Sequence, residues 1–182
     1  MRIVGGEARG RPLRAVPGRS TRPTADRVRQ GLFDLLGQRM DGLRVLDLYA
    51  GTGAMAIEAV SRGAASAVLI EKDPRACAVI QSNIDALEYA GKCRLLRDDV
   101  AGALARLRGE RFDLVFSDPP YALQASQMVI DALSSNDLLA EDARAVLESS
   151  RRDPAPRLPA GFSELASRTY GEARVLVVGR RS

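Results

Sequence analysis

The sequence of 182 residues contains no histidine, and lysine accounts for only two of its 27 basic residues. Histidine is the commonest general base and the commonest metal ligand in proteins. Chemistry performed by this chain must therefore rely on carboxylates, backbone groups and aromatic side chains, and we expect no metal site.

Cysteine and long apolar runs are scarce as well. Cys77 and Cys93 fall in a predicted helix and a predicted strand without the spacing of metal ligands, which favours reduced thiols. No apolar run approaches the roughly 20 residues of a membrane-spanning helix, and the N-terminal residues lack the apolar core of a signal peptide. We expect a cytoplasmic protein without membrane association, built as one domain or as one domain with a small appendage.

Positive charge is concentrated at one end. Residues 1–30 hold eight arginines against Glu7 and Asp26, so this segment carries +6 and the rest of the chain −2, for a total of +4. Arginine pairs with phosphate through two N–H groups and stacks on bases, so the crowding favours a nucleic-acid surface. The alternative is compositional, because arginine replaces lysine throughout the chain, but composition does not explain the concentration at one end.

From residue 44 onward, short apolar runs alternate with helical stretches. This alternation predicts an α/β fold with a mostly parallel sheet and helices on both faces. The last two runs, on either side of Gly171 and Glu172, predict an antiparallel hairpin. The predicted strands are 44–49, 67–71, 93–97, 112–117, 143–148, 164–170 and 174–179, and the predicted helices are 54–62, 74–89, 100–107 and 126–133.

A different segment precedes the sheet. Residues 1–20 are rich in glycine, arginine and proline and predict a small β-hairpin or arm. Thr24 is expected to cap a helix that runs to Leu36. The apolar face of this helix comprises Val28, Leu32, Phe33, Leu35 and Leu36.

A glycine loop follows the first predicted strand. Gly51 and Gly53 lie between that strand and a helix, and Glu71 ends the next strand 20 residues after Gly51. This spacing is typical of sites for nucleotide cofactors, in which glycines let the backbone approach the ligand and the acid holds the ribose hydroxyls. Asp47 lies where the pyrophosphate of NAD would bind, and its carboxylate would repel that doubly negative group. S-adenosylmethionine instead brings a positive ammonium and a positive sulfonium, so Asp47 favours S-adenosylmethionine over NAD. The alternative is a glycine turn capped by Asp47.

Asp98 and Asp99 end the third predicted strand. One of them, with Asp99 favoured, is expected to accept a hydrogen bond from the adenine amino group of the cofactor, and Val100 is expected to pack on the ring. The alternative is that the two acids are solvated and cap the helix that follows.

The segment Asp118-Pro119-Pro120-Tyr121 ends the fourth predicted strand. An exocyclic base amine is a poor nucleophile because its lone pair is delocalised into the ring. The Asp118 carboxylate and the Pro119 carbonyl can hold its hydrogens and direct the lone pair at a methyl group, while Tyr121 stacks on a base taken out of its helix or loop. The alternative is that this segment is only a rigid turn. However, the segment and the glycine loop are both expected at the same edge of the sheet, which favours an amine methyltransferase.

These residues resemble the RsmD family of bacterial small-subunit rRNA guanine-N2 methyltransferases over nearly the whole chain. The segments that carry the resemblance are 2–6, 9–11, 22–24, 26–29, 32–33, 46–53, 71–72, 98–99, 118–121 and 170–171. The resemblance implies a Rossmann-like, class I S-adenosylmethionine-dependent fold with a seven-stranded sheet. It also implies a 16S rRNA guanine as the target, in an assembled small subunit, and we expect a monomer.

The resulting prediction divides the chain into an RNA-binding arm (1–22) and a methyltransferase domain (23–182). The predicted catalytic residues are Asp118, Pro119, Pro120 and Tyr121. The predicted cofactor-binding residues are Asp47, Tyr49, Ala50, Gly51, Gly53, Glu71, Lys72, Asp98, Asp99, Val100 and Asp118, although Tyr49 could equally be a core residue. The predicted RNA-binding residues are Arg2, Arg9, Arg11, Arg14, Arg19, Arg22 and Thr24, although Arg22 and Thr24 could instead form a turn and a helix cap.

Three other functions remain open. An adenine-N6 DNA methyltransferase would use the same amine chemistry, but about 40 residues of arm and helix leave little room for a DNA-recognition domain. An NAD-dependent oxidoreductase is disfavoured by Asp47. A non-catalytic RNA-binding protein is disfavoured by the intact glycine loop and Asp118.

Overall fold

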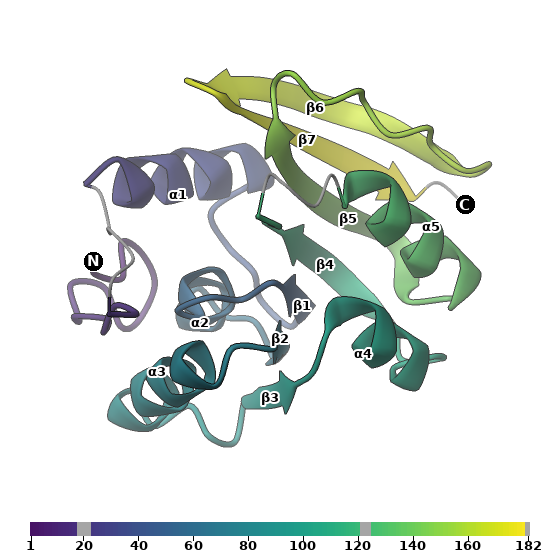
Figure 1. Ribbon diagram of the computed structural model, residues 1–182. Coiled ribbons are helices and arrows are strands. Elements are labelled where there is room, and N and C mark those ends of the chain that lie inside the picture. The colour runs from purple at the N-terminus through teal and green to yellow at the C-terminus, as the bar shows by residue number, and fades with distance from the viewer. Residues whose placement is uncertain (18–22, 121–124, 181–182) are drawn as a thin grey trace.

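The computed structural model describes residues 1–17, 23–120 and 125–180, and for residues 23–25 it describes the backbone (Figure 1). Seven strands form one sheet of order β3-β2-β1-β4-β5-β7-β6, in which β7 runs antiparallel to both of its neighbours and the other pairs are parallel. The predicted mostly parallel sheet with a closing hairpin is confirmed. The strands are β1 (Arg44–Leu48), β2 (Ser66–Glu71), β3 (Cys93–Arg97), β4 (Phe112–Ser117), β5 (Leu139–Ser150), β6 (Phe162–Tyr170) and β7 (Ala173–Arg180).

Helices cover both faces of this sheet, because alternate strand residues point to opposite sides and both sides are apolar. Leu32 and Phe33 pack with Ile57 and Ile80 into one buried cluster, and Leu104 and Val129 belong to a second cluster on the other face. The covering helices are α1 (Pro23–Leu36), α2 (Ala54–Ser61) and α3 (Pro74–Ala86) on the first face, and α4 (Val100–Arg106) and α5 (Ser126–Ser135) on the second.

Several predicted boundaries differ from those of the structure, including the starts of α1 and β5 and the end of α3. Helix α1 begins at Pro23, so Thr24 lies within its first turn and is not the cap. Helix α3 ends at Ala86 rather than near Tyr89, because Glu88 takes a left-handed conformation (φ 60°). Strand β5 begins at Leu139, four residues before the predicted start, because its first residues pair irregularly beside β4.

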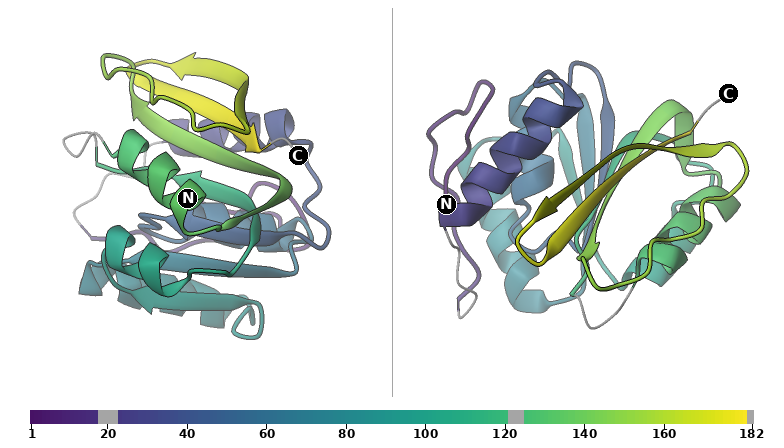
Figure 2. Two further views of the ribbon diagram at one scale, coloured as in Figure 1. Left: turned by 90° about the vertical axis from the view of Figure 1, so that its right-hand side faces the viewer. Right: turned by 90° about the horizontal axis from the view of Figure 1, so that it is seen from above.

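The N-terminal segment folds back on itself and packs against α2. Arg2 and Pro12 form an antiparallel bridge, and the Ile3 N–H donates to the Arg11 carbonyl at 3.0 Å. Ile3 is fully buried. Gly6 is required at its position, since its φ is 76° and a Cβ there would collide with the Ser61 carbonyl. Figures 1 and 2 show α1 between this segment and the β6–β7 hairpin.

Candidate active site

A pocket of about 1080 Å³ lies at the carboxyl ends of the parallel strands. The strand order reverses between β1 and β4, and ligands of open α/β sheets bind outside the strand ends at such a point. The pocket wall includes most of the predicted cofactor residues together with three predicted catalytic residues. These are Asp47, Tyr49, Ala50, Gly51, Glu71, Lys72, Asp98, Asp99, Val100, Asp118, Pro119 and Pro120.

The glycine loop between β1 and α2 turns tightly through three left-handed residues, Tyr49 (φ 60°), Gly51 (φ 60°) and Gly53 (φ 76°). Gly51 lines the pocket, whereas Gly53 is absent from its wall. Gly53 starts α2, and a Cβ on it would lie 3.0 Å from the Leu69 Cδ2 atom of β2. Gly53 therefore supports the loop from behind by letting α2 approach the sheet, and the structure does not bring it to the ligand surface.

Glu71 holds this loop in place. Its Oε2 atom accepts a hydrogen bond from the Gly51 N–H at 2.9 Å, and its Oε1 atom accepts one from the Asp73 N–H at 2.9 Å. The carboxylate is buried among the pocket residues. Each carboxylate oxygen can accept a further hydrogen bond, so the group keeps acceptors for ribose hydroxyls.

Asp47 is almost completely buried at the end of β1, and its Oδ2 atom accepts a hydrogen bond from the Ala56 N–H at 3.1 Å. Burial, with smaller contributions from the negative charges of Asp118 and Glu71, raises the pKa of Asp47 to about 7, and the hydrogen bond from the Ala56 N–H acts in the opposite direction. Three acids thus converge on one end of the glycine loop. A cationic ligand relieves their repulsion, whereas a pyrophosphate would add to it.

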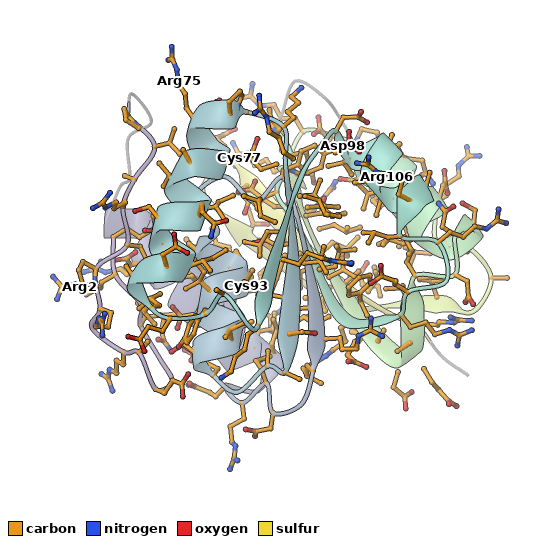
Figure 3. The ribbon with its side chains drawn as sticks, turned by 90° about the horizontal axis from the view of Figure 1, so that it is seen from below. Arg2, Arg75, Cys77, Cys93, Asp98 and Arg106 are labelled. Atoms are coloured by element: carbon orange, nitrogen blue, oxygen red, sulfur yellow. The ribbon has the colours of Figure 1, made fainter. Side chains whose placement is uncertain are left out.

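Asp98 and Asp99 both line the pocket, yet each also has a partner within the protein. Asp99 is the N-cap of α4, and its Oδ1 atom accepts a hydrogen bond from the Gly102 N–H at 2.9 Å. Asp98 forms an ion pair with Arg106, which is visible at α4 in Figure 3. The capping alternative is therefore realised for Asp99, while its place in the pocket wall leaves the proposed adenine contact open.

Asp118 follows β4 and is an exposed residue of the pocket wall, and the next residue, Pro119, is a buried part of the same wall. Loss of hydration within the pocket wall, together with a smaller contribution from the charge of Glu148, raises the pKa of Asp118 to about 7. At neutral pH its carboxyl group can therefore accept a proton or release one. Tyr121, the last predicted catalytic residue, lies outside the described residues.

Several residues of the pocket wall were not predicted from the sequence, including three with charged or exposed side chains. Glu148 lies near the end of β5, Arg29 lies on α1, and Met128 on α5 leaves 39% of its surface exposed. An acid at the end of a predicted strand is the signal that identified Asp47 and Glu71, and it would also have identified Glu148. Arg29 offered no comparable signal, because its position depends on a buried ion pair with Glu58 at 3.3 Å.

The predicted RNA-binding arginines are spread over the surface of the N-terminal segment. Arg2, Arg9, Arg11 and Arg14 are exposed, and Figure 3 shows Arg2 pointing away from the protein. Arg11 has a structural contact as well, because its Nη2 atom donates to the Ala86 carbonyl at 2.8 Å. Arg19 and Arg22, together with the side chain of Thr24, lie outside the described residues.

Two absences concern the part of the chain that the structure describes. Within it, no group of three or more acidic or cysteine side chains is placed to hold a metal ion. No helix in the same residues is long and apolar enough to span a membrane. Cys77 on α3 and Cys93 on β3 are free thiols on separate elements (Figure 3).

The fold and the pocket together define a Rossmann-like S-adenosylmethionine-dependent methyltransferase. A family model described as "Conserved hypothetical protein 95" matches residues 1–179, and the chain belongs to this family, the RsmD family.

Comparison with individual proteins agrees with this assignment. The chain is 36% identical over 172 residues to the Ribosomal RNA small subunit methyltransferase D of Escherichia coli strain K12, covering 94% of this chain and 86% of that protein. It is 35% identical over 183 residues to YlbH of Bacillus subtilis strain 168, covering all of both chains. The solved structure of Escherichia coli yhhF superimposes with a TM-score of 0.90 at 34% identity, covering 100% of this chain and 98% of that one.

Proposed function

We propose that this protein transfers a methyl group from S-adenosylmethionine to the exocyclic N2 of a guanine in 16S rRNA. The observation that carries the proposal is the placement of Asp118 and Pro119 on the wall of the pocket that also contains the glycine loop and Glu71. The similarity to a methyltransferase named for the small ribosomal subunit supports the choice of RNA.

Residues around the glycine loop fit the cofactor. Glu71 accepts hydrogen bonds from the ribose hydroxyls, Asp99 accepts from the adenine amine, and Val100 and Tyr49 pack beside the adenosine. Asp47 would attract the ammonium group near the Gly51 and Ala50 backbone. Lys72 would lie near the ribose, and Asp118 would lie near the sulfonium. The bound cofactor supplies an electrophilic methyl group.

The protein prepares the amine at Asp118. Its carboxylate and the Pro119 carbonyl accept the two hydrogens of the guanine amine, which turns the nitrogen lone pair toward the methyl group. Proximity and alignment then supply most of the rate increase. Pro120 stiffens this turn, and Tyr121 stacks on the flipped base. Asp118 or solvent takes the proton that the amine loses.

The N-terminal arm binds RNA phosphates through Arg2, Arg9, Arg11, Arg14, Arg19 and Arg22. Thr24 contributes to the pocket for the base. We propose that the substrate is an assembled small subunit in the cytoplasm, and that the enzyme acts as a monomer. Arginines that pair with phosphates bind a large folded RNA in a salt-dependent manner.

The test is tritiated methyl transfer to small subunits that lack this modification, with naked rRNA and DNA as parallel substrates. Label in subunit rRNA that digests to N2-methylguanosine supports the proposal. Label in DNA adenine supports the adenine-N6 alternative instead. Cofactor binding without label in any substrate favours the non-catalytic RNA-binding alternative.

A further inference from the structure

Glu148 lines the same pocket as Asp118, and the proposed transfer leaves it without a role. It belongs to β5, which pairs in parallel with β4, the strand that leads into Asp118. The side chain is partly exposed, in contrast to its neighbours Leu147 and Ser149, which are buried. A carboxylate near the end of β5 therefore lies in the pocket wall.

The sheet register places Glu148 beside Asp118. The last paired residues of the two strands are Ser117 and Leu147, so the residue after each lies one step further along neighbouring strands. Neighbouring strands are about 4.8 Å apart, and corresponding residues point to the same face. The charge of Glu148 contributes to the raised pKa of Asp118, as expected for two carboxyl groups that share one pocket.

The amino-bearing bases differ in the atom next to their amine. Guanine carries N1–H on one side of its N2 amine, so the N1 and N2 positions together present two adjacent donors to the protein. Adenine and cytosine carry a bare ring nitrogen there, which is an acceptor. A carboxylate accepts hydrogen bonds and donates none when it is ionised. A second carboxylate beside the amine-holding one therefore matches guanine and opposes the other two bases.

We propose that Glu148 selects guanine by accepting a hydrogen bond from its N1–H while Asp118 holds the N2 amine. The inference rests on the proposed guanine-N2 transfer and adds to it the residue that recognises the base. Adenine in this position would set its N1 lone pair against the Glu148 carboxylate. A site built to bind an N–H discriminates strongly against an analogue that lacks it, because its own polar group is then left unpaired.

The experiment replaces the target guanine by 2-aminopurine and Glu148 by glutamine, separately and in combination. The methylated position is first mapped with the wild-type enzyme, and subunits are then reconstituted with rRNA carrying 2-aminopurine at that position. This base keeps the N2 amine but has an acceptor at N1. Glu148→Gln keeps the size of the side chain and supplies an N–H donor. Glu141→Gln is the matched control, since Glu141 is an exposed residue of the same strand outside the pocket.

Wild-type enzyme and the control variant are expected to prefer guanine over 2-aminopurine in kcat/KM. In Glu148→Gln the preference falls by about 10- to 100-fold, which corresponds to one hydrogen bond to a charged group. 2-Aminopurine also lacks the O6 atom of guanine. Comparing the guanine-to-2-aminopurine ratio of kcat/KM in the wild type with the same ratio in Glu148→Gln removes the effect of this second difference. Cofactor affinity, measured by calorimetry, stays unchanged in the variant, which shows that the pocket remains folded.

An unchanged preference in a Glu148→Gln enzyme that binds the cofactor normally overturns this inference and leaves the proposed function standing. A wild-type enzyme that labels no guanine N2 in any subunit overturns the proposed function and the inference together.

Discussion

The backbone N–H of Gly51 donates a hydrogen bond to the Oε2 atom of Glu71 at 2.9 Å. This bond joins the loop after β1 to the end of β2, two segments that are 20 residues apart. The acid that fits the ribose and the glycine that lets the ligand approach therefore form one unit. A change in Glu71 should affect cofactor binding through both its own contact and the shape of the loop.

Replacing Glu71 by alanine should weaken S-adenosylmethionine binding by about 10- to 100-fold, because the ribose loses a charged acceptor and the loop loses its anchor. The measurement is a calorimetric titration of the purified variant. Glu164→Ala on the exposed edge strand β6 is the control and should bind as the wild type does. An affinity for Glu71→Ala within a factor of two of the control would contradict the assigned contact.

Cofactor affinity should rise as the pH rises toward about 7, the pKa of Asp47. The free protein holds a proton on Asp47 below this pH because its carboxylate is buried, whereas the ammonium of the cofactor favours the ionised form. Binding therefore releases a proton, and binding tightens as fewer protons compete. Titrations in two buffers of different ionisation enthalpy measure this release. It should shrink in Asp47→Asn, and an equal release from the variant would count against the ammonium contact.

Glu58 should be among the most important polar residues for stability. It is fully buried on α2 and pairs with Arg62 at 2.9 Å and with Arg29 at 3.3 Å. It also accepts backbone hydrogen bonds from Val4 and Gly5 of the N-terminal segment. Removing one partner of a buried ion pair leaves uncompensated charge, so Glu58→Ala should lower the free energy of unfolding by about 3–5 kcal/mol.

Urea unfolding followed by circular dichroism measures this change. The exposed Glu141→Ala variant should differ from the wild type by less than about 0.5 kcal/mol. A similarly small effect of Glu58→Ala would mean that the network does not hold the N-terminal segment in place.

Alanine replacements of Arg2, Arg9 and Arg14 should weaken binding to small-subunit rRNA and flatten its salt dependence. Arg11 is left intact because its side chain also binds the Ala86 carbonyl. The slope of log affinity against log salt should fall by about 0.7–0.9 for each phosphate contact that is lost. The measurement is filter binding over a series of salt concentrations.

The control for this series removes the same number of positive charges at the edge of the sheet where the parallel strands begin. Arg44, Arg94 and Arg111 lie at or near the amino ends of β1, β3 and β4. Their replacement should leave the slope unchanged. If both triple variants behaved alike, the N-terminal segment would not be the RNA surface.

The sheet could be predicted because apolar runs alternate with helical stretches, and β3 and β4 have the predicted bounds. The acids at the strand ends could be predicted to meet, since the carboxyl ends of parallel strands share one edge. The end of α3 could not, because a glutamate, Glu88, takes the left-handed conformation that usually marks a glycine.

Long-range side-chain contacts were the other part that the sequence did not show. The pairing of Glu58 with Arg29 joins two helices and brings Arg29 to the pocket wall, and no local pattern identifies such a partner. Gly53 matched a cofactor motif, yet the structure places it behind the loop, because a motif does not distinguish a ligand contact from a close helix–strand approach.

The measurement that tests the central claim most directly compares the wild type with Asp118→Ala in the same two assays. These are calorimetric binding of S-adenosylmethionine and mass spectrometry of N2-methylguanosine formed in unmodified small subunits. We predict that Asp118→Ala binds the cofactor nearly as well as the wild type and forms no detectable N2-methylguanosine. Undiminished methylation by Asp118→Ala would contradict the assignment of this carboxylate as the group that holds the amine.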